Sequence, residues 1–221
     1  MDAVKFIGYA GAFMPLLTVL IFVLVWKSVW EKHKSLLLYA AASFFLFCAG
    51  GQIFGKEDNN SLLYNIAVLA ELVLACYYIL KIILKKSFSL QFVIVSGSYF
   101  IFWLCNILFP DASNALNGNP AIAANLILLL LSMYYFLNLS AGEEILYFQK
   151  LPSFWIISGF LIYTALRLLV FISYRYINTI TTIIEPGQVY MMNSIATIIE
   201  YALICMGLLC NRRNTSSRIY L

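Results

Sequence analysis

Residues 62–84 read LLYNIAVLAELVLACYYILKIIL, and this stretch decides the class of the fold. Ahead of Lys81 it carries a single charged residue, Glu71. At about 1.5 Å per residue, a helix of this length can cross about 30 Å of hydrocarbon. The whole chain is 63% hydrophobic and 11% charged, whereas about a quarter of the residues of a soluble domain are charged. The stretch therefore predicts a membrane-spanning helix.

Six further apolar runs of similar length are bounded by charged or turn-forming residues. They cover approximately 6–26, 36–55, 88–109, 120–140, 153–174 and 189–210. No connection between the runs is long enough to form a domain of its own. We therefore predict an all-α membrane protein in which residues 1–221 form a single domain, a bundle of seven transmembrane helices.

The basic residues predict the orientation of this bundle. Ten lie in the connections on one side, namely Lys27, Lys32, Lys34, Lys81, Lys85, Lys86, Lys150, Arg212, Arg213 and Arg218. The other side carries Lys5, Lys56 and Arg175. Cytoplasmic loops are rich in Lys and Arg, so we expect the C-terminus inside and, with an odd number of spans, the N-terminus outside. The expected location is the plasma membrane, as a multi-pass protein of the bacterial inner membrane type.

The third and seventh runs resemble each other. A gap-free alignment of 63–80 with 192–209 pairs Ile66/Ile195, Ala67/Ala196, Glu71/Glu200, Leu74/Leu203, Cys76/Cys205 and Leu80/Leu209. The pairing of two glutamates inside apolar runs is the informative part. It suggests a 3+1+3 plan of two parallel repeats joined by one helix, which resembles the small sugar transporters in topology. The chain lacks the Pro-Gln motif of those families, and the seventh run has no lysine for a retinal Schiff base.

Three charged residues fall well inside the predicted spans: Glu71, Arg167 and Glu200. A charge at the centre of a membrane helix costs about 2.5–3.5 kcal/mol, so such residues usually face the bundle interior and have partners. Helical spacing extends each charge into a polar stripe, with Tyr64 and Tyr78 beside Glu71, Tyr163 and Tyr174 beside Arg167, and Asn193 and Thr197 beside Glu200. We expect these stripes to meet in a ligand or proton site formed by Glu71, Arg167, Glu200, Asn193, Thr197, Tyr64 and Tyr163.

Two glutamates and one arginine leave one negative charge in excess. In a medium of low dielectric constant the excess is relieved by protonating a carboxyl, by binding a cation or by admitting water. A site of this kind could sense or carry protons. The alternative is that the arginine, clamped between two carboxylates, only holds three helices together.

Polar amides gather in the outer half of the predicted bundle: Gln52, Asn65, Asn106, Asn125 and Asn193. One such residue alone would be expected only to form an interhelical hydrogen bond, worth about 0.6 kcal/mol. Five at similar depth predict an outward-facing polar cavity beside Arg167. The aromatic residues of the inner half are expected to form an interfacial belt, namely Trp26, Trp30, Tyr77, Tyr78, Tyr134, Tyr135 and Trp155.

The sequence offers little for enzymatic chemistry. His33 is the single histidine and stands among Glu31, Lys32 and Lys34, so we expect a solvated side chain in the 27–35 loop. One histidine excludes both a zinc site of the intramembrane hydrolase type and a Ser-His-Asp triad. The five cysteines form no CxxC pair, which argues against a metal site or a disulfide framework. We expect no cofactor, no bound metal and no enzyme activity.

Three functions remain open. The first is a receptor-like or sensory bundle that binds a small molecule or a proton from outside and signals through a separate cytoplasmic or membrane partner. The second is a small-solute or proton-coupled transporter that uses the paired glutamates. The third is a structural or pore-forming subunit. The bilayer is the one partner that all three share, and the net charge of +4 lies mostly in short loops, which gives no reason to expect nucleic acid.

Overall fold

The computed structural model describes residues 3–52, 60–84, 88–108, 118–141, 148–180 and 186–217, which form seven α-helices and no strand. The helices are α1 (Ala3–Leu24), α2 (Trp26–Gln52), α3 (Asn60–Leu84), α4 (Phe88–Leu108), α5 (Gly118–Ser140), α6 (Pro152–Ile180) and α7 (Pro186–Ser217). A short 3₁₀ turn at 148–150 precedes α6. The predicted all-α class is confirmed.

Six of these helices, α1 and α3 to α7, are long and apolar enough to cross a membrane. A chain with that many such helices is a multi-pass membrane protein. The first turns of α2 carry Lys27, Glu31, Lys32 and Lys34. Whether α2 also crosses, and which end of the bundle faces the cytoplasm, remain predictions.

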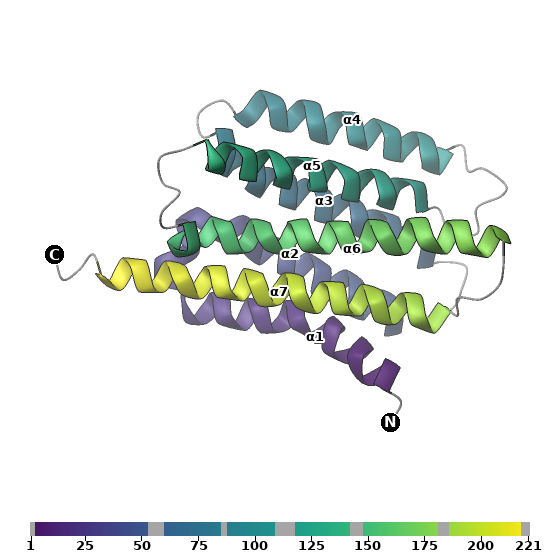
Figure 1. Ribbon diagram of the computed structural model, residues 1–221, viewed down its shortest axis with the longest axis horizontal. Helices are drawn as coiled ribbons and strands as arrows, with labels where there is room; N and C mark the ends of the chain where they lie inside the picture. Colours follow the sequence, from purple (N-terminus) through teal and green to yellow (C-terminus); the bar gives the residue numbers. More distant parts are fainter. Residues whose placement is uncertain are drawn as a thin grey trace.

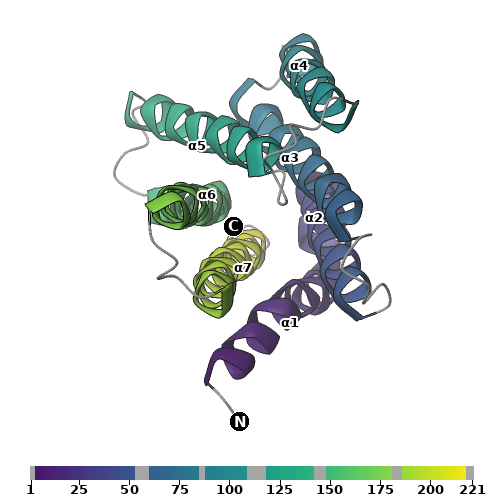
Figure 2. The ribbon, with the colours of Figure 1, turned by 90° about the vertical axis from the view of Figure 1, so that its right-hand side faces the viewer.

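The helices form a ring with one member outside it. Successive helices run in opposite directions, and the two termini lie toward opposite ends of the bundle (Figure 1). Seen along the bundle, α1, α2, α3, α5, α6 and α7 follow one another around the ring, and each packs on the next (Figure 2). The ring closes where α7 packs on α1, and α7 also touches α2. Helix α4 packs on the outer side of α3 and α5, so it takes no part in the ring interior.

Glycines let α7 lie close to its neighbours. A Cβ atom on Gly159 of α6 would stand 2.9 Å from the backbone oxygen of Glu200. A Cβ atom on Gly207 of α7 would stand 2.7 Å from the backbone oxygen of Pro152. Small residues at such points allow helix backbones in a membrane to approach closely. The backbones of α6 and α7 are therefore closely packed at the level of Glu200.

The structure corrects the predicted loop at 27–35. Helix α2 already begins at Trp26, and only Val25 separates it from α1. The charged residues of this segment are good helix formers, and low hydropathy marks the membrane boundary rather than the end of a helix. Helices α6 and α7 likewise continue beyond their predicted spans, to Ile180 and Ser217.

The prediction of a solvated His33 is wrong. His33 is 5% exposed, and its Nδ1 lies 3.0 Å from the hydroxyl oxygen of Tyr78. It occupies a buried stripe of α2 together with Val29, Leu36 and Ala40, at helical spacing. That spacing is the sequence signal that the charged neighbours of His33 obscured.

The aromatic belt is correct only in part. Trp26, Trp30 and Tyr134 are exposed, as residues facing lipid headgroups should be. Tyr78 and Tyr135 are buried instead. The hydroxyl of Tyr135 lies 2.9 Å from that of Ser153, so both tyrosines contribute hydrogen bonds between helices.

Candidate functional site

Glu71 of α3, Arg167 of α6 and Glu200 of α7 are all buried, at 7%, 3% and 1% exposure. Arg167 Nη1 donates a hydrogen bond to Glu71 Oε2 at 3.1 Å, which makes a buried ion pair. Glu200 lies in the electrostatic field of both residues. The three charges that sequence spacing grouped therefore share one region of the interior.

Aromatic residues of α6 hold the guanidinium of Arg167. Its Nη1 also donates to the hydroxyl of Tyr163, one turn earlier on the same helix. The guanidinium carbon lies 5.1 Å from the ring centroid of Tyr163 and 5.8 Å from that of Phe171. Cation–π contacts of this length add to the ion pair, so Arg167 is fixed from its own helix as well as by Glu71.

Helix α2 supplies hydrogen-bond donors to both glutamates. The hydroxyl of Tyr39 donates to Glu200 Oε1 at 2.6 Å, and that of Ser43 donates to Glu71 Oε1 at 3.5 Å. Glu71 thus has a charged partner, whereas the hydrogen bond recorded for Glu200 comes from a neutral phenol. This difference in partners decides which carboxyl tolerates a negative charge better.

Sequence reasoning missed Tyr39 and Ser43, although a signal for them exists. Aligning 36–52 with 160–176 without gaps pairs Leu37/Leu161, Tyr39/Tyr163, Ala41/Ala165 and Phe47/Phe171. In this alignment Tyr39 and Ser43 stand opposite Tyr163 and Arg167. A search for a repeat between the second and sixth runs would have brought α2 into the site.

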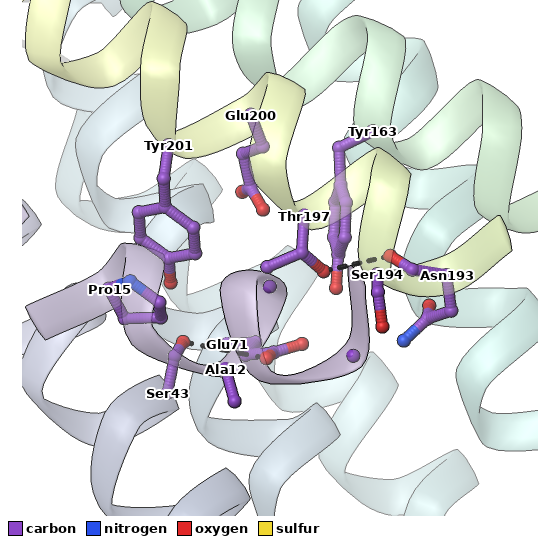
Figure 3. A pocket seen from close by; sticks show the side chains of 12 residues that line it. Ala12, Pro15, Ser43, Glu71, Tyr163, Asn193, Ser194, Thr197, Glu200 and Tyr201 are labelled. Carbon is purple, nitrogen blue, oxygen red and sulfur yellow. Dashed lines mark hydrogen bonds between the residues drawn. The ribbon is translucent and has the colours of Figure 1, made fainter. Parts of the chain in front are cut away.

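A small cavity lies beside the two carboxyls (Figure 3), and the part of α1 that lines it is its N-terminal half up to Pro15. Its walls are Gly8, Gly11, Ala12 and Pro15 of α1, Ser43 of α2, Glu71 of α3, Tyr163 of α6, and Asn193, Ser194, Thr197, Glu200 and Tyr201 of α7. The cavity volume is about 10 Å³, which is close to the minimum needed to hold one water molecule. A drug-sized ligand needs a pocket of about 300 Å³ or more.

The hydroxyl of Tyr201, at the wall of this cavity, needs a hydrogen-bond partner. Tyr201 is 2% exposed and lines the cavity. Ser43 is near enough to influence its hydroxyl, but no atom of the described residues stands in good hydrogen-bond geometry with it. Buried hydroxyls are normally bonded to protein or to ordered water. The cavity is therefore suited to one water molecule that bonds to Tyr201 and to a carboxyl.

Most of the predicted site residues meet here. Glu71, Glu200, Tyr163, Asn193 and Thr197 line the cavity, and Arg167 joins them through Glu71. The hydroxyl of Thr197 donates to the backbone oxygen of Asn193 at 3.0 Å. The side chain of Tyr64 lies outside the described residues. That this region binds a ligand or a proton remains a prediction.

The outer amides are arranged differently. The described side chains of Asn65, Asn106 and Asn125 do not line this cavity, and the side chain of Gln52 lies outside the described residues. Asn125 Nδ2 donates to the backbone oxygen of Ala121 at 2.6 Å, within α5. Asn106 Nδ2 bonds to the backbone oxygen of Phe102 in the same way, at 3.4 Å. Of the four predicted cavity residues whose side chains the structure describes, Asn193 is the one that lies at the cavity with Glu71 and Glu200.

The chemistry available to the cluster is the transfer or storage of a proton. Within the described ranges no three His, Cys, Asp or Glu side chains come together as they would around a metal ion. The carboxyls, the phenols of Tyr39 and Tyr201 and the hydroxyl of Ser43 are groups that exchange or relay protons.

Comparison of the chain with protein-family models, with curated proteins and with solved structures finds no match.

Proposed function

We propose that this protein is a proton-sensing membrane bundle, in which Glu200, beside the ion-paired Glu71, exchanges a proton with the outer side and a resulting helix shift is read by a separate partner. The observation that carries the proposal is a pair of buried carboxyls, one of them paired with the guanidinium of Arg167, beside a cavity of one-water size. A site for a larger ligand would need more room than this state of the bundle offers.

The two glutamates have different parts in this proposal. Glu71 is paired with Arg167, whose positive charge stabilises the carboxylate. Glu200 has Tyr39 as its hydrogen-bond donor, and burying a second carboxylate without a second cation costs several kcal/mol. Glu200 is therefore the carboxyl that we expect to carry the proton near neutral pH. Loss of that proton would place a new charge against α1, α2 and α6.

Helix α1 is the element best suited to move. Pro15 has no N–H group, so the backbone oxygen of Gly11 lacks its usual helical donor. The N-terminal part of α1 turns away from the remainder of the helix (Figure 1). Gly11 and Pro15 both line the cavity. A change of charge at Glu200 would act directly on this weak point of α1.

The proposed topology is a seven-span protein with the N-terminus outside and the C-terminus in the cytoplasm, in a bacterial inner membrane. The alternating helix directions and the ten-to-three distribution of Lys and Arg support it. The described residues contain no domain outside the helices. The signal would accordingly pass to a separate cytoplasmic or membrane partner.

A proton-coupled transporter is the second candidate, and the order of the ring favours it. In that order α1–α2–α3 and α5–α6–α7 occupy equivalent places, with α3–α5 and α7–α1 as the equivalent junctions. The Glu71/Glu200 and Tyr39/Tyr163 pairs occupy matching helices of the two halves. These relationships support a parallel repeat, which is a common plan of transporters.

Infrared difference spectroscopy of the carboxylic C=O stretch tests the proposal. The purified protein would be titrated between about pH 5 and 9, a range in which ordinary carboxyls are already ionised. We expect a titrating band in the wild type that disappears in Glu200→Gln and persists in Glu71→Gln. With no titrating band in the wild type, the charges would only hold the helices together and the sensing proposal would be abandoned.

A further inference from the structure

A second buried polar pair, remote from the glutamates, joins α2 to α3. His33 Nδ1 and the hydroxyl oxygen of Tyr78 are 3.0 Å apart, with ring centroids separated by 5.7 Å. His33 is 5% exposed and Tyr78 1% exposed. Tyr135 of α5 is close enough to Tyr78 to interact with it electrostatically. The exposed Lys34 follows His33 on α2. Histidine is the side chain whose charge ordinarily changes near neutral pH.

This pair lies toward the end of the bundle that is predicted to face the cytoplasm. On α2, His33 precedes Tyr39 by six residues, and on α3, Tyr78 follows Glu71 by seven. At about 1.5 Å per residue, α2 and α3 place the pair about 9 Å and about 10.5 Å from the glutamate level, toward the same end of the bundle. Two polar layers are thus stacked along the interior of the ring.

An aromatic side chain, Phe160 of α6, contacts a tyrosine of each layer. It is fully buried, with its ring centroid 5.3 Å from that of Tyr39 and 6.3 Å from that of Tyr78. Leu72 and Ala75, which lie between Glu71 and Tyr78 on α3, are also fully buried. An apolar layer without room for water blocks proton transfer, because a proton needs a continuous chain of hydrogen bonds.

We propose that His33 and Tyr78 form a second proton-exchanging site, on the inner side of the glutamates, and that Phe160 is the barrier between the two layers. The inference rests on the proposed function, since it takes the central carboxyls to exchange protons with the outer side. When Phe160 is displaced, water connects the layers. A proton released by the glutamic acid then passes to the neutral imidazole of His33, and the imidazolium releases a proton to the inner solution. The bundle would in that state conduct protons inward.

Proton flux into vesicles tests the barrier. The full chain would be reconstituted in phosphatidylcholine vesicles that contain a pH-sensitive dye, and a pH step would be applied with potassium and valinomycin to hold the potential at zero. We expect Phe160→Ala to raise the flux at least tenfold over the wild type. Phe22→Ala is the matched control, because Phe22 is equally buried but packs on Trp26 and Trp30 rather than between the two layers.

Removing the imidazole tests the inner site. The double variant Phe160→Ala/His33→Gln should lose most of the added flux, whereas Phe160→Ala/Lys34→Gln, which changes an exposed neighbour, should keep it. Phe160→Leu preserves most of the volume and should show a smaller rise if the alanine variant does not fold. Flux through Phe160→Ala or Phe160→Leu no higher than through Phe22→Ala overturns the barrier, and flux indifferent to His33 overturns the inner site.

The infrared titration separates this inference from the proposed function. If the Glu200 band titrates in Phe160→Ala but the flux does not rise, the sensing site stands and the inward path is wrong. If the wild type has no titrating carboxyl, the proposed function fails whatever the flux. A raised flux that also survives Glu200→Gln would show a leak that bypasses the glutamates, and would overturn the path.

Discussion

Arg167 and Glu71 form an ion pair between α6 and α3, two helices that α5 separates in the ring. The Nη1 to Oε2 distance is 3.1 Å, and 3% and 9% of the two side chains are exposed. The pair therefore spans the interior rather than joining neighbouring helices. Loss of the ion pair should therefore destabilise the whole ring and not only one contact between neighbouring helices.

Replacing Arg167 by Gln should destabilise the bundle strongly, by about 3–5 kcal/mol, because two buried carboxyls lose their cation. The double variant Glu71→Gln/Arg167→Gln removes one of those carboxyls and should recover part of the loss. Unfolding in mixed detergent micelles measures the free energies of all members of the cycle. Strictly additive losses would mean that the pair contributes no coupling, and the interior cluster would have to be abandoned.

Replacing Tyr39 by Phe should cost about 1–3 kcal/mol, because Glu200 loses the hydroxyl that donates to it at 2.6 Å. In Glu200→Gln the same replacement should cost less, since a neutral amide depends less on that donor. Tyr134→Phe is the control: Tyr134 is exposed, and its change should stay within about 0.5 kcal/mol. Thermal unfolding of the variants provides the comparison, and equal effects of Tyr39→Phe in both backgrounds would contradict the assigned bond.

Replacing Gly159 by Ala should push α6 away from α7, because the new Cβ would stand 2.9 Å from the backbone oxygen of Glu200. The expected loss is about 1–3 kcal/mol, as for other overpacked sites. Gly97→Ala on α4 is the matched control, since its Cβ would meet nothing within 4 Å and alanine is the better helix former. Should Gly97→Ala be as damaging as Gly159→Ala, the close approach of α6 and α7 would not be the cause.

Cysteines introduced in segment 111–119 should react with a membrane-impermeant maleimide from outside. Cysteines introduced in segment 141–150 should react only after the membrane is opened. The expectation follows from the distribution of Lys and Arg. A variant without the native cysteines is the background, because Cys105 is exposed on α4. If the labelling showed the opposite sidedness, the glutamate site would face the cytoplasm and the His33 site would face the outside.

Hydropathy predicted seven spans and the all-α class, and six of the seven helices are long and apolar enough to cross a membrane, because apolar length is a property of each run alone. It failed at the start of α2, where Lys27 and Lys34 mark the polar end of a helix that continues through them. The burial of His33 follows from packing against α3, and hydropathy carries no information about neighbours. The spacing of Val29, His33 and Leu36 did contain that information.

The charged residues of the site could be predicted from the sequence. Glu71, Arg167 and Glu200 stand out because an ionised side chain in a membrane helix demands a partner. The hydroxyls of Tyr39 and Ser43 do not stand out, since neutral residues are tolerated in spans without any partner. Which donor serves which glutamate depends on how α2 packs against α3 and α7, and residue spacing within single helices does not give that packing.

The position of α4 has a consequence for how such a chain can be built. Helices α3 and α5 run in the same direction, and α4 is the segment that reverses the chain between them (Figure 1). A ring of two three-helix units in like orientation cannot be joined by a short loop, since each unit ends on the side opposite to the one on which it begins. Helix α4 thus serves chain direction: it returns the chain to the end of the bundle at which α1 begins, so that α5 can start there and run in the same direction as α1 and α3.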